Sequence, residues 1–228
     1  MHEGHRDRVK KRFRQEGLDH FSDIQALELL LFYGIPRVDT NPIAHALLDR
    51  FGSLSQVLEA SPEELMKVPG VGENAALLLT LIPQMGRFYM VDRSSRVTIL
   101  QTLEQCADFL VPHFFGRRVE TVFILCLDAK CKLLCCKELG EGGPNSTGVS
   151  IRKIVETAIG VNAATVVLAH NHPSGLAVPS AEDIQTTRRI AHALQAVEIT
   201  LADHIIVADG DYVSIAMSDD RFRDCLLI

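Results

Sequence analysis

The first part of the chain has its apolar residues at helical spacing. Leu27, Leu30 and Leu31 fall on one face of a predicted helix, and Asn41-Pro42 marks the start of another. Strand-like patterns are rare before residue 90. The pattern predicts a small all-helical domain over residues 1–92.

From Val97 onward, β-branched apolar runs alternate with helical patterns, and the polar stretch 90–96 before them predicts a linker. We expect a second domain over residues 93–228. This mixed order is typical of an α/β or α+β sheet flanked by helices. The predicted strands lie near 119–128, 131–139, 164–170 and 202–208, and the predicted helices near 102–114, 150–160 and 180–195.

The segment HNHPSGLAVPSAED, residues 170–183, carries the most informative chemistry of the chain. It follows a buried strand, so His170 and His172, two residues apart, should project from one face of the strand's end. A Pro-Ser-Gly turn then reverses the chain. Ser180 is a natural N-cap for the next helix, with Asp183 at its third position, which would return Asp183 to the histidines.

Two imidazoles and one carboxylate leave the fourth position of a tetrahedral zinc ion open for water, as catalytic zinc requires. His170, His172 and Asp183 are therefore candidate ligands. Another interpretation also fits the residues: paired histidines are often structural, and helix capping alone accounts for Ser180 and Asp183. For Asp183 the two roles are compatible.

The sequence HxHPSG followed by PSxxD resembles the JAMM motif of MPN-type zinc metalloproteases, in the wording of the bacterial RadC family. The resemblance extends over nearly the whole chain, with residues 120–128 similar to the family's first core strand and 202–207 to its late one. It implies a JAMM/MPN-like fold, one zinc ion per chain and hydrolysis of a peptide or isopeptide bond. One segment departs from the family: residues 151–153 read Ile-Arg-Lys where relatives often have Pro-Arg-Glu, so that glutamate's role does not transfer.

The resemblance also implies two catalytic roles. Glu120, ahead of a core strand, matches the glutamate that shuttles the proton from water to the leaving amine, with Glu138 and Glu141 as weaker alternatives. Ser180 would hydrogen-bond the oxyanion of the tetrahedral intermediate. His204 either supports the site from a neighbouring strand or is an ordinary core histidine.

Residues 65–75, LMKVPGVGENA, fit a helix-hairpin-helix motif. Gly70 and Gly72 permit a tight hairpin and leave main-chain N–H groups open to a DNA phosphate, and residues 34–52 could be a degenerate second copy. Such glycine turns also join helices that bind nothing, and Glu73 disfavours phosphate.

A basic cluster occupies residues 6–14, where Lys10, Lys11 and Arg12 could contact phosphates at helical spacing. The same charges also suit a solvated helix face. DNA is therefore a candidate partner of the first domain.

Bulk properties exclude some classes of protein. The chain is 47% hydrophobic with a net charge of −6, so no general attraction to nucleic acid or anionic membrane is expected. No apolar run is long enough to span a membrane, and the charged start is unlike a secretory signal. The six cysteines form no CxxC pair, which favours free thiols and a cytoplasmic location.

The leading hypothesis is a zinc-dependent hydrolase acting on an unknown protein or peptide with narrow specificity. The alternative is a DNA-binding repair or recombination accessory whose metal site is structural or vestigial. A metal-dependent nuclease is a third possibility. The sequence does not name the substrate.

Overall fold

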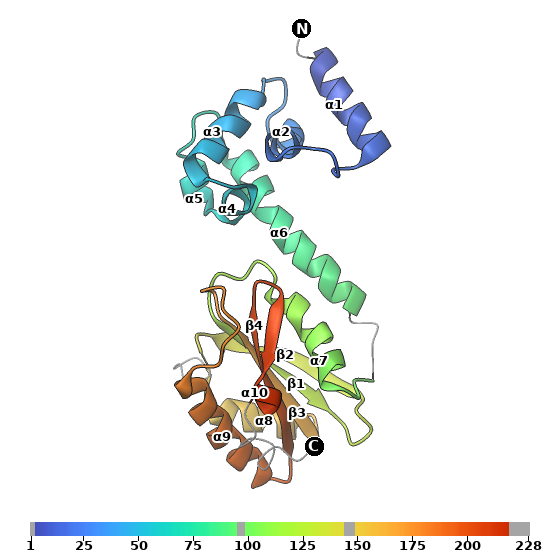
Figure 1. Cartoon of the computed structure of the whole chain (residues 1–228), viewed down its shortest axis with the longest axis vertical. Helices are drawn as coiled ribbons and strands as arrows, with labels where there is room; N and C mark the ends of the chain where they lie inside the picture. Colours follow the sequence, from blue (N-terminus) through green and yellow to red (C-terminus); the bar gives the residue numbers. More distant parts are fainter. Residues whose placement is uncertain (1–2, 95–98, 144–148, 219–228) are drawn as a thin grey trace. The chain divides into compact units, whose positions relative to one another are not determined.

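The computed structural model describes residues 3–94, 99–143 and 149–218. The chain forms two compact units, Met1–Gly86 and Arg87–Ile228, coloured from blue to red along the sequence in Figure 1. In its described part the first unit is helical, and the second contains a mixed sheet flanked by helices. The predicted fold class is thereby confirmed.

The helices of the first unit enclose a core of large aliphatic side chains. Serine caps explain several of the helix starts: Ser22, Ser53 and Ser61 each accept a hydrogen bond from a main-chain N–H of the first turn. The fully buried members of the core include Leu27, Leu31, Leu47, Leu65 and Leu79. The helices are α1 (Glu3–Glu16), α2 (Asp23–Gly34), α3 (Asn41–Phe51), α4 (Leu54–Glu59), α5 (Pro62–Leu65) and α6 (Glu73–Ser94).

Helix α6 corrects the predicted linker over residues 90–96. Met90 to Ser94 are helical, and the rest of that segment lies outside the described residues. Polarity alone does not end a helix, and no glycine or proline interrupts α6 after Gly86. The predicted domain division after residue 92 and the division of the structure after Gly86 both fall inside this helix.

The sheet of the second unit has the order β2-β1-β3-β4-β5. Strands β3 and β4 are parallel and joined through α9, whereas the other neighbouring pairs are antiparallel. The four predicted strands are present, and β5 is an addition that the sequence did not indicate. The strands are β1 (Thr121–Leu127), β2 (Leu133–Glu141), β3 (Thr165–Asn171), β4 (Thr200–Ala208) and β5 (Asp211–Ser214).

Helices cover both faces of this sheet, with α7 to the right of it and α9 to the left in Figure 1. Residues of β1 alternate between the faces: Ile124 packs in the core that includes α8 and α9, and Phe123 packs with α7. All seven residues of β1 are buried. The helical elements are α7 (Leu103–Leu110), the 3₁₀ helix η1 (Val111–Phe114), α8 (Ile151–Gly160), α9 (Ala181–Gln195) and α10 (Ile215–Ser218).

Among the described helices, including the 22-residue α6, none combines the length and apolar character needed to cross a membrane.

Candidate metal centre

A strand followed by a helix places the candidate residues together. His170 lies near the end of β3 and is fully buried, and His172 follows two residues later. Because α9 returns along the sheet to begin β4, its first turn lies at the end of β3 from which the histidines project. Chain turns at the carboxyl ends of parallel strands are common sites for ligands.

The start of α9 holds Asp183 in a capping box. The Ser180 hydroxyl and main-chain N–H both donate to Asp183 Oδ2, at 2.6 and 2.8 Å, and the Asp183 N–H donates back to Ser180 Oγ at 3.1 Å. Asp183 is only 6% exposed. The predicted N-cap is confirmed, and its carboxylate faces the histidines.

Two imidazoles and two carboxylates converge at this point. Nε2 of His170 lies 3.0 Å from Nε2 of His172, 3.3 Å from Oδ1 of Asp183 and 3.6 Å from Oε1 of Glu120. Oδ2 of Asp183 is 3.5 Å from Nε2 of His172. Glu120, His170 and His172 have ligand atoms within 4.8 Å of one another and form a group that can hold a metal ion.

Hydrogen bonds around the site fix which nitrogen of each histidine carries a proton. Nδ1 of His172 lies 3.1 Å from the carbonyl oxygen of Leu176, which can only accept, so this nitrogen is the donor. In the neutral ring, the Nε2 atom that faces the site therefore has a free lone pair.

A longer chain of hydrogen bonds orients His170. The hydroxyl of Thr187 donates to the carbonyl oxygen of Asp183 at 2.6 Å, so it accepts from Nδ1 of His204, also at 2.6 Å. Burial, and then the nearby His170, hold the pKa of His204 well below its ordinary value, so its ring is neutral. Nε2 of His204 must then accept from Nδ1 of His170, at 2.8 Å, which leaves Nε2 of His170 free for a ligand.

The donor set therefore fits a metal ion. Two Nε2 atoms and two carboxylates point at one another, and a cation between them, either a shared proton or a metal ion, would stabilise such an arrangement. Imidazole and carboxylate together are typical ligands of zinc and related divalent ions. The Nδ1 atoms of His170 and His172, which face away from the site, both have hydrogen-bond partners, as is usual for metal-binding histidines.

Burial opposes ionisation of Asp183, but the neighbouring His170 and the hydrogen bonds from Ser180 outweigh it and hold the pKa of this carboxyl below its ordinary value. Asp183 is consequently a carboxylate at neutral pH. A charged acceptor is thus already in place beside the two histidines.

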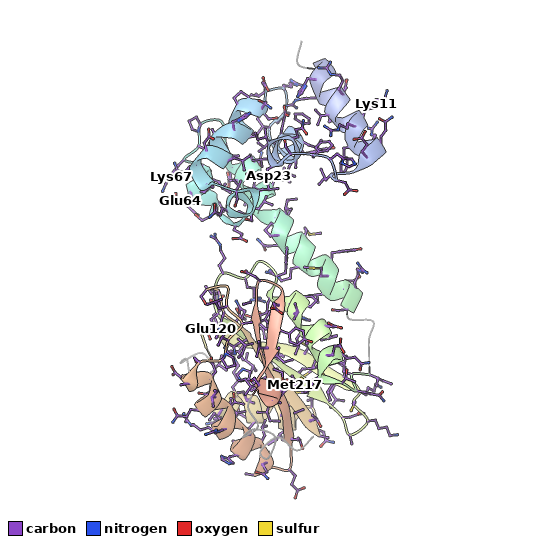
Figure 2. All side chains as sticks on the ribbon, viewed as in Figure 1. Lys11, Asp23, Glu64, Lys67, Glu120 and Met217 are labelled. Atoms are coloured by element: carbon purple, nitrogen blue, oxygen red, sulfur yellow. The ribbon has the colours of Figure 1, made fainter. Side chains whose placement is uncertain are left out.

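The remaining predicted residues of this unit are placed as follows. The side chain of Glu120, labelled in Figure 2, is 34% exposed and reaches the histidines from the start of β1. Ser180 is adjacent, but its hydroxyl proton is directed to Asp183 rather than to open space. The alternative shuttle Glu138 is paired with Arg117 at 2.7 Å.

In the first unit, the basic residues of α1 divide into two kinds. Arg12 is committed to internal contacts: it donates to Gln25 at 3.2 Å, and its guanidinium lies 4.8 Å from the centre of the Phe21 ring. Lys10 lies over Tyr33. Lys11 is exposed and lies on the outer side of α1 in Figure 2. Of these three residues it is therefore the one whose side chain is free to contact either solvent or a phosphate.

The two hairpin glycines differ in surroundings. Gly70 has a φ of +90°, and a Cβ there would come within 2.8 Å of Ile43, so glycine is needed for the packing of this turn. A Cβ on Gly72 would meet nothing within 4 Å. The surface before the first turn of α6 is open, which is compatible with the predicted phosphate contact.

Two polar residues that contact the site were not predicted from the sequence. Thr187 fixes the tautomer of His204, and Asn171 bonds the main chain around Glu120. Thr187 lies one helical turn after Asp183, a spacing that could have suggested a shared face. No local signal marks the partners of Asn171, which lie some 50 residues away.

Comparisons with known proteins agree with this architecture. Residues 100–220 match the RadC-like JAB domain family, and residues 3–77 match the UPF0758 N-terminal family. A UPF0758 protein of Fusobacterium nucleatum is 33% identical over 219 residues, which cover 93% of this chain and 94% of the relative. These matches show that the chain belongs to the RadC-like JAB domain family.

Proposed function

We propose that this protein is a zinc-dependent hydrolase that cleaves a peptide or isopeptide bond in a narrow set of substrates. The observation that carries the proposal is the convergence of the Nε2 atoms of His170 and His172, 3.0 Å apart, with two carboxylates beside them. A purely structural histidine pair has no need for this accumulation of acceptors. The relatives' family name supports the proposal but does not specify a reaction.

His170, His172 and Asp183 would hold the metal, because all three are fixed by partners outside the site. Glu120 would act as the proton carrier, since its side chain is more exposed than the other three and can reach a bound water. A bound zinc ion would activate that water and polarise the scissile carbonyl.

The chain's own residues then account for the proton movements. The Glu120 carboxylate accepts a proton from the attacking water and delivers it to the leaving nitrogen. Ser180 would donate a hydrogen bond to the developing oxyanion, and to do so its hydroxyl must turn away from Asp183. Asp183 would keep its second donor, the Ser180 main-chain N–H, during this exchange.

The test begins with protein purified without chelator. Metal analysis should find about one zinc ion per chain, and His170→Ala, His172→Ala and Asp183→Ala should each lose it. A peptide-library screen of the zinc-loaded protein then seeks cleavage that is absent from the His172→Ala variant. Equal zinc content in the wild type and all three variants would end the proposal.

DNA binding by the first unit is a second candidate function. It is supported by the open surface at Gly72 and by the exposed Lys11. Contacts of this kind would be independent of base sequence and sensitive to salt. The two functions are compatible, because they use different units of the chain.

A further inference from the structure

Asn171, the last residue of β3, has a side chain that bonds the main chain on both sides of Glu120. Its Oδ1 atom accepts from the N–H of Thr121 at 2.8 Å, and its Nδ2 atom donates to the carbonyl oxygen of Val119 at 3.2 Å. An N–H can only donate and a carbonyl can only accept, so these partners fix the orientation of the amide. Asn171 is 4% exposed, and its bond to Thr121 is buried, whereas its bond to Val119 is partly buried.

These bonds replace the strand ladder where it ends. The pairing of β1 with β3 runs from Leu127 and Thr165 to Val122 and His170 and extends no further. Glu120 lies just beyond that end. The side chain of Asn171 therefore holds the segment that carries Glu120 to the strand that carries His170.

A third hydrogen bond holds the main chain of Glu120, and a glycine leaves space for its side chain. The N–H of Gly142 donates to the carbonyl oxygen of Glu120 at 2.6 Å. A Cβ on Gly143 would come within 2.7 Å of Oε1 of Glu120, so the absence of a side chain there leaves room for the carboxylate. A partly exposed glutamate would otherwise sample several rotamers.

We propose that Asn171 is a positioning residue, which sets the Glu120 carboxylate relative to the metal-binding histidines. The inference rests on the proposed function, in which Glu120 carries the proton. A general base must lie within hydrogen-bond reach of its proton, and a displacement of about 1 Å can cost about 10²-fold in rate. Asn171 thus links the base to the ligand strand without touching the reacting atoms.

The test uses the full-length protein and Asn171→Ala, with Zn²⁺ as the only probe. The Glu120 carboxyl carbon is followed by NMR after ¹³C labelling of glutamate, and Glu120→Gln identifies its signal. In the wild type this signal should shift on addition of Zn²⁺. In Asn171→Ala the shift should be much smaller, while Zn²⁺ affinity, from chelator competition, should fall far less than the 10–100-fold typical of losing a ligand's hydrogen-bond partner.

Two further variants separate positioning from folding. Asn171→Asp keeps the acceptor for Thr121 and loses the donor to Val119, so it should fold even if the alanine variant does not, with a Glu120 response below that of the wild type. Ile199→Val removes a buried methyl group from the core of the same unit. This control should lose some thermal stability and keep the full Glu120 response.

The metal-free protein gives a separate readout. Hydrogen exchange at the Thr121 amide should rise at least about tenfold in Asn171→Ala relative to the neighbouring β1 amides, because its acceptor is gone. An unchanged Thr121 rate, or a Glu120 signal that responds equally in wild type and Asn171→Ala, overturns the positioning role. Failure of the wild type to bind Zn²⁺ would overturn the proposed function instead. The exchange measurement would still decide whether Asn171 holds the main chain around Glu120.

Discussion

Nδ1 of His170 lies 2.8 Å from Nε2 of His204, and this one hydrogen bond determines which nitrogen of His170 faces the candidate metal site. His204 belongs to the neighbouring strand β4 and is fully buried. Its other nitrogen is held by Thr187 on α9. His170 is thus oriented by a residue of the neighbouring strand β4 and, through it, by a residue of α9.

The first prediction concerns this support. Thr187→Val removes the acceptor of His204 at nearly constant volume, and His204→Ala removes the acceptor of His170. Each should weaken Zn²⁺ binding by about 10–100-fold, because hydrogen-bond partners of metal ligands typically contribute that much. Chelator competition measures the affinity, with Ile199→Val as the control for lost core packing. Affinity at the wild-type level in both variants would show that His170 needs no such orientation.

The second prediction separates the roles of the two carboxylates. Glu120→Gln keeps size and polarity but cannot carry a proton, so zinc content should stay near that of the wild type. Stability should change by no more than about 0.5 kcal/mol, as for most partly exposed positions. Turnover of any peptide found in the screen should fall by about two to four orders of magnitude.

Two results would contradict that assignment. Loss of zinc from Glu120→Gln would make Glu120 a ligand, in keeping with its place in the group of possible metal-binding residues. Turnover near the wild-type rate would place the proton carrier elsewhere, and Glu138 would be the next residue to substitute.

The third prediction concerns the buried carboxyl of Asp203, which accepts from the N–H groups of His204 and Ala216 at 2.7 and 3.0 Å. Burial raises its pKa above the ordinary value of 3.8, against hydrogen bonds that favour the charged form. Asp203→Asn keeps an acceptor oxygen and removes the buried charge. The free energy of unfolding at pH 7 should therefore stay constant or rise by about 1 kcal/mol.

The pH dependence follows from the direction of that shift. Between pH 3.8 and the raised pKa, the folded state binds more protons at Asp203 than the unfolded state does, so falling pH favours folding there. The advantage of Asp203→Asn over the wild type should shrink as pH falls through this window in denaturant titrations. Asp203→Ala, which leaves two buried N–H groups without their acceptor, should instead lose about 1–3 kcal/mol. A gain on Asp203→Asn that grows with acidity would contradict the assignment.

The fourth prediction tests DNA binding by the first unit. Lys11→Gln should weaken binding of the full-length protein to duplex DNA and reduce the salt slope by about one phosphate contact, with little change in thermal stability. Arg12→Gln should lower stability instead, because Arg12 bonds Gln25 and lies over Phe21. Fluorescence anisotropy at several salt concentrations gives the slope. Absence of measurable DNA binding by the wild type would remove this second function.

Short-range patterns predicted the parts of the site that lie close in sequence. The alternation before His170 indicated the strand, the spacing to His172 indicated the shared face, and Ser180 indicated the helix start that returns Asp183. The position of Glu120 came only from the family resemblance, because 50 residues separate it from His170. Periodicity gives no information on how two such distant segments pair.

Other features depend on tertiary context that the sequence does not express locally. Strand β5 has four residues, too few for a clear alternation, and forms by pairing with the end of β4. The charge of Arg12 suggested a phosphate contact, and no local pattern indicated its contacts with Phe21 and Gln25. The amide of Asn171 reaches its partners because β1 and β3 are paired in the folded chain.

Asp183 belongs to two structures at once, since it completes the capping box of α9 and also faces the histidines. A descendant chain that stopped using metal would still gain stability from an aspartate here, because the helix start needs it with or without an ion. The two histidines have no comparable role in stabilising the start of the helix. When relatives are sorted into active and inactive members, His170 and His172 are therefore the diagnostic positions, and an aspartate at 183 says little by itself.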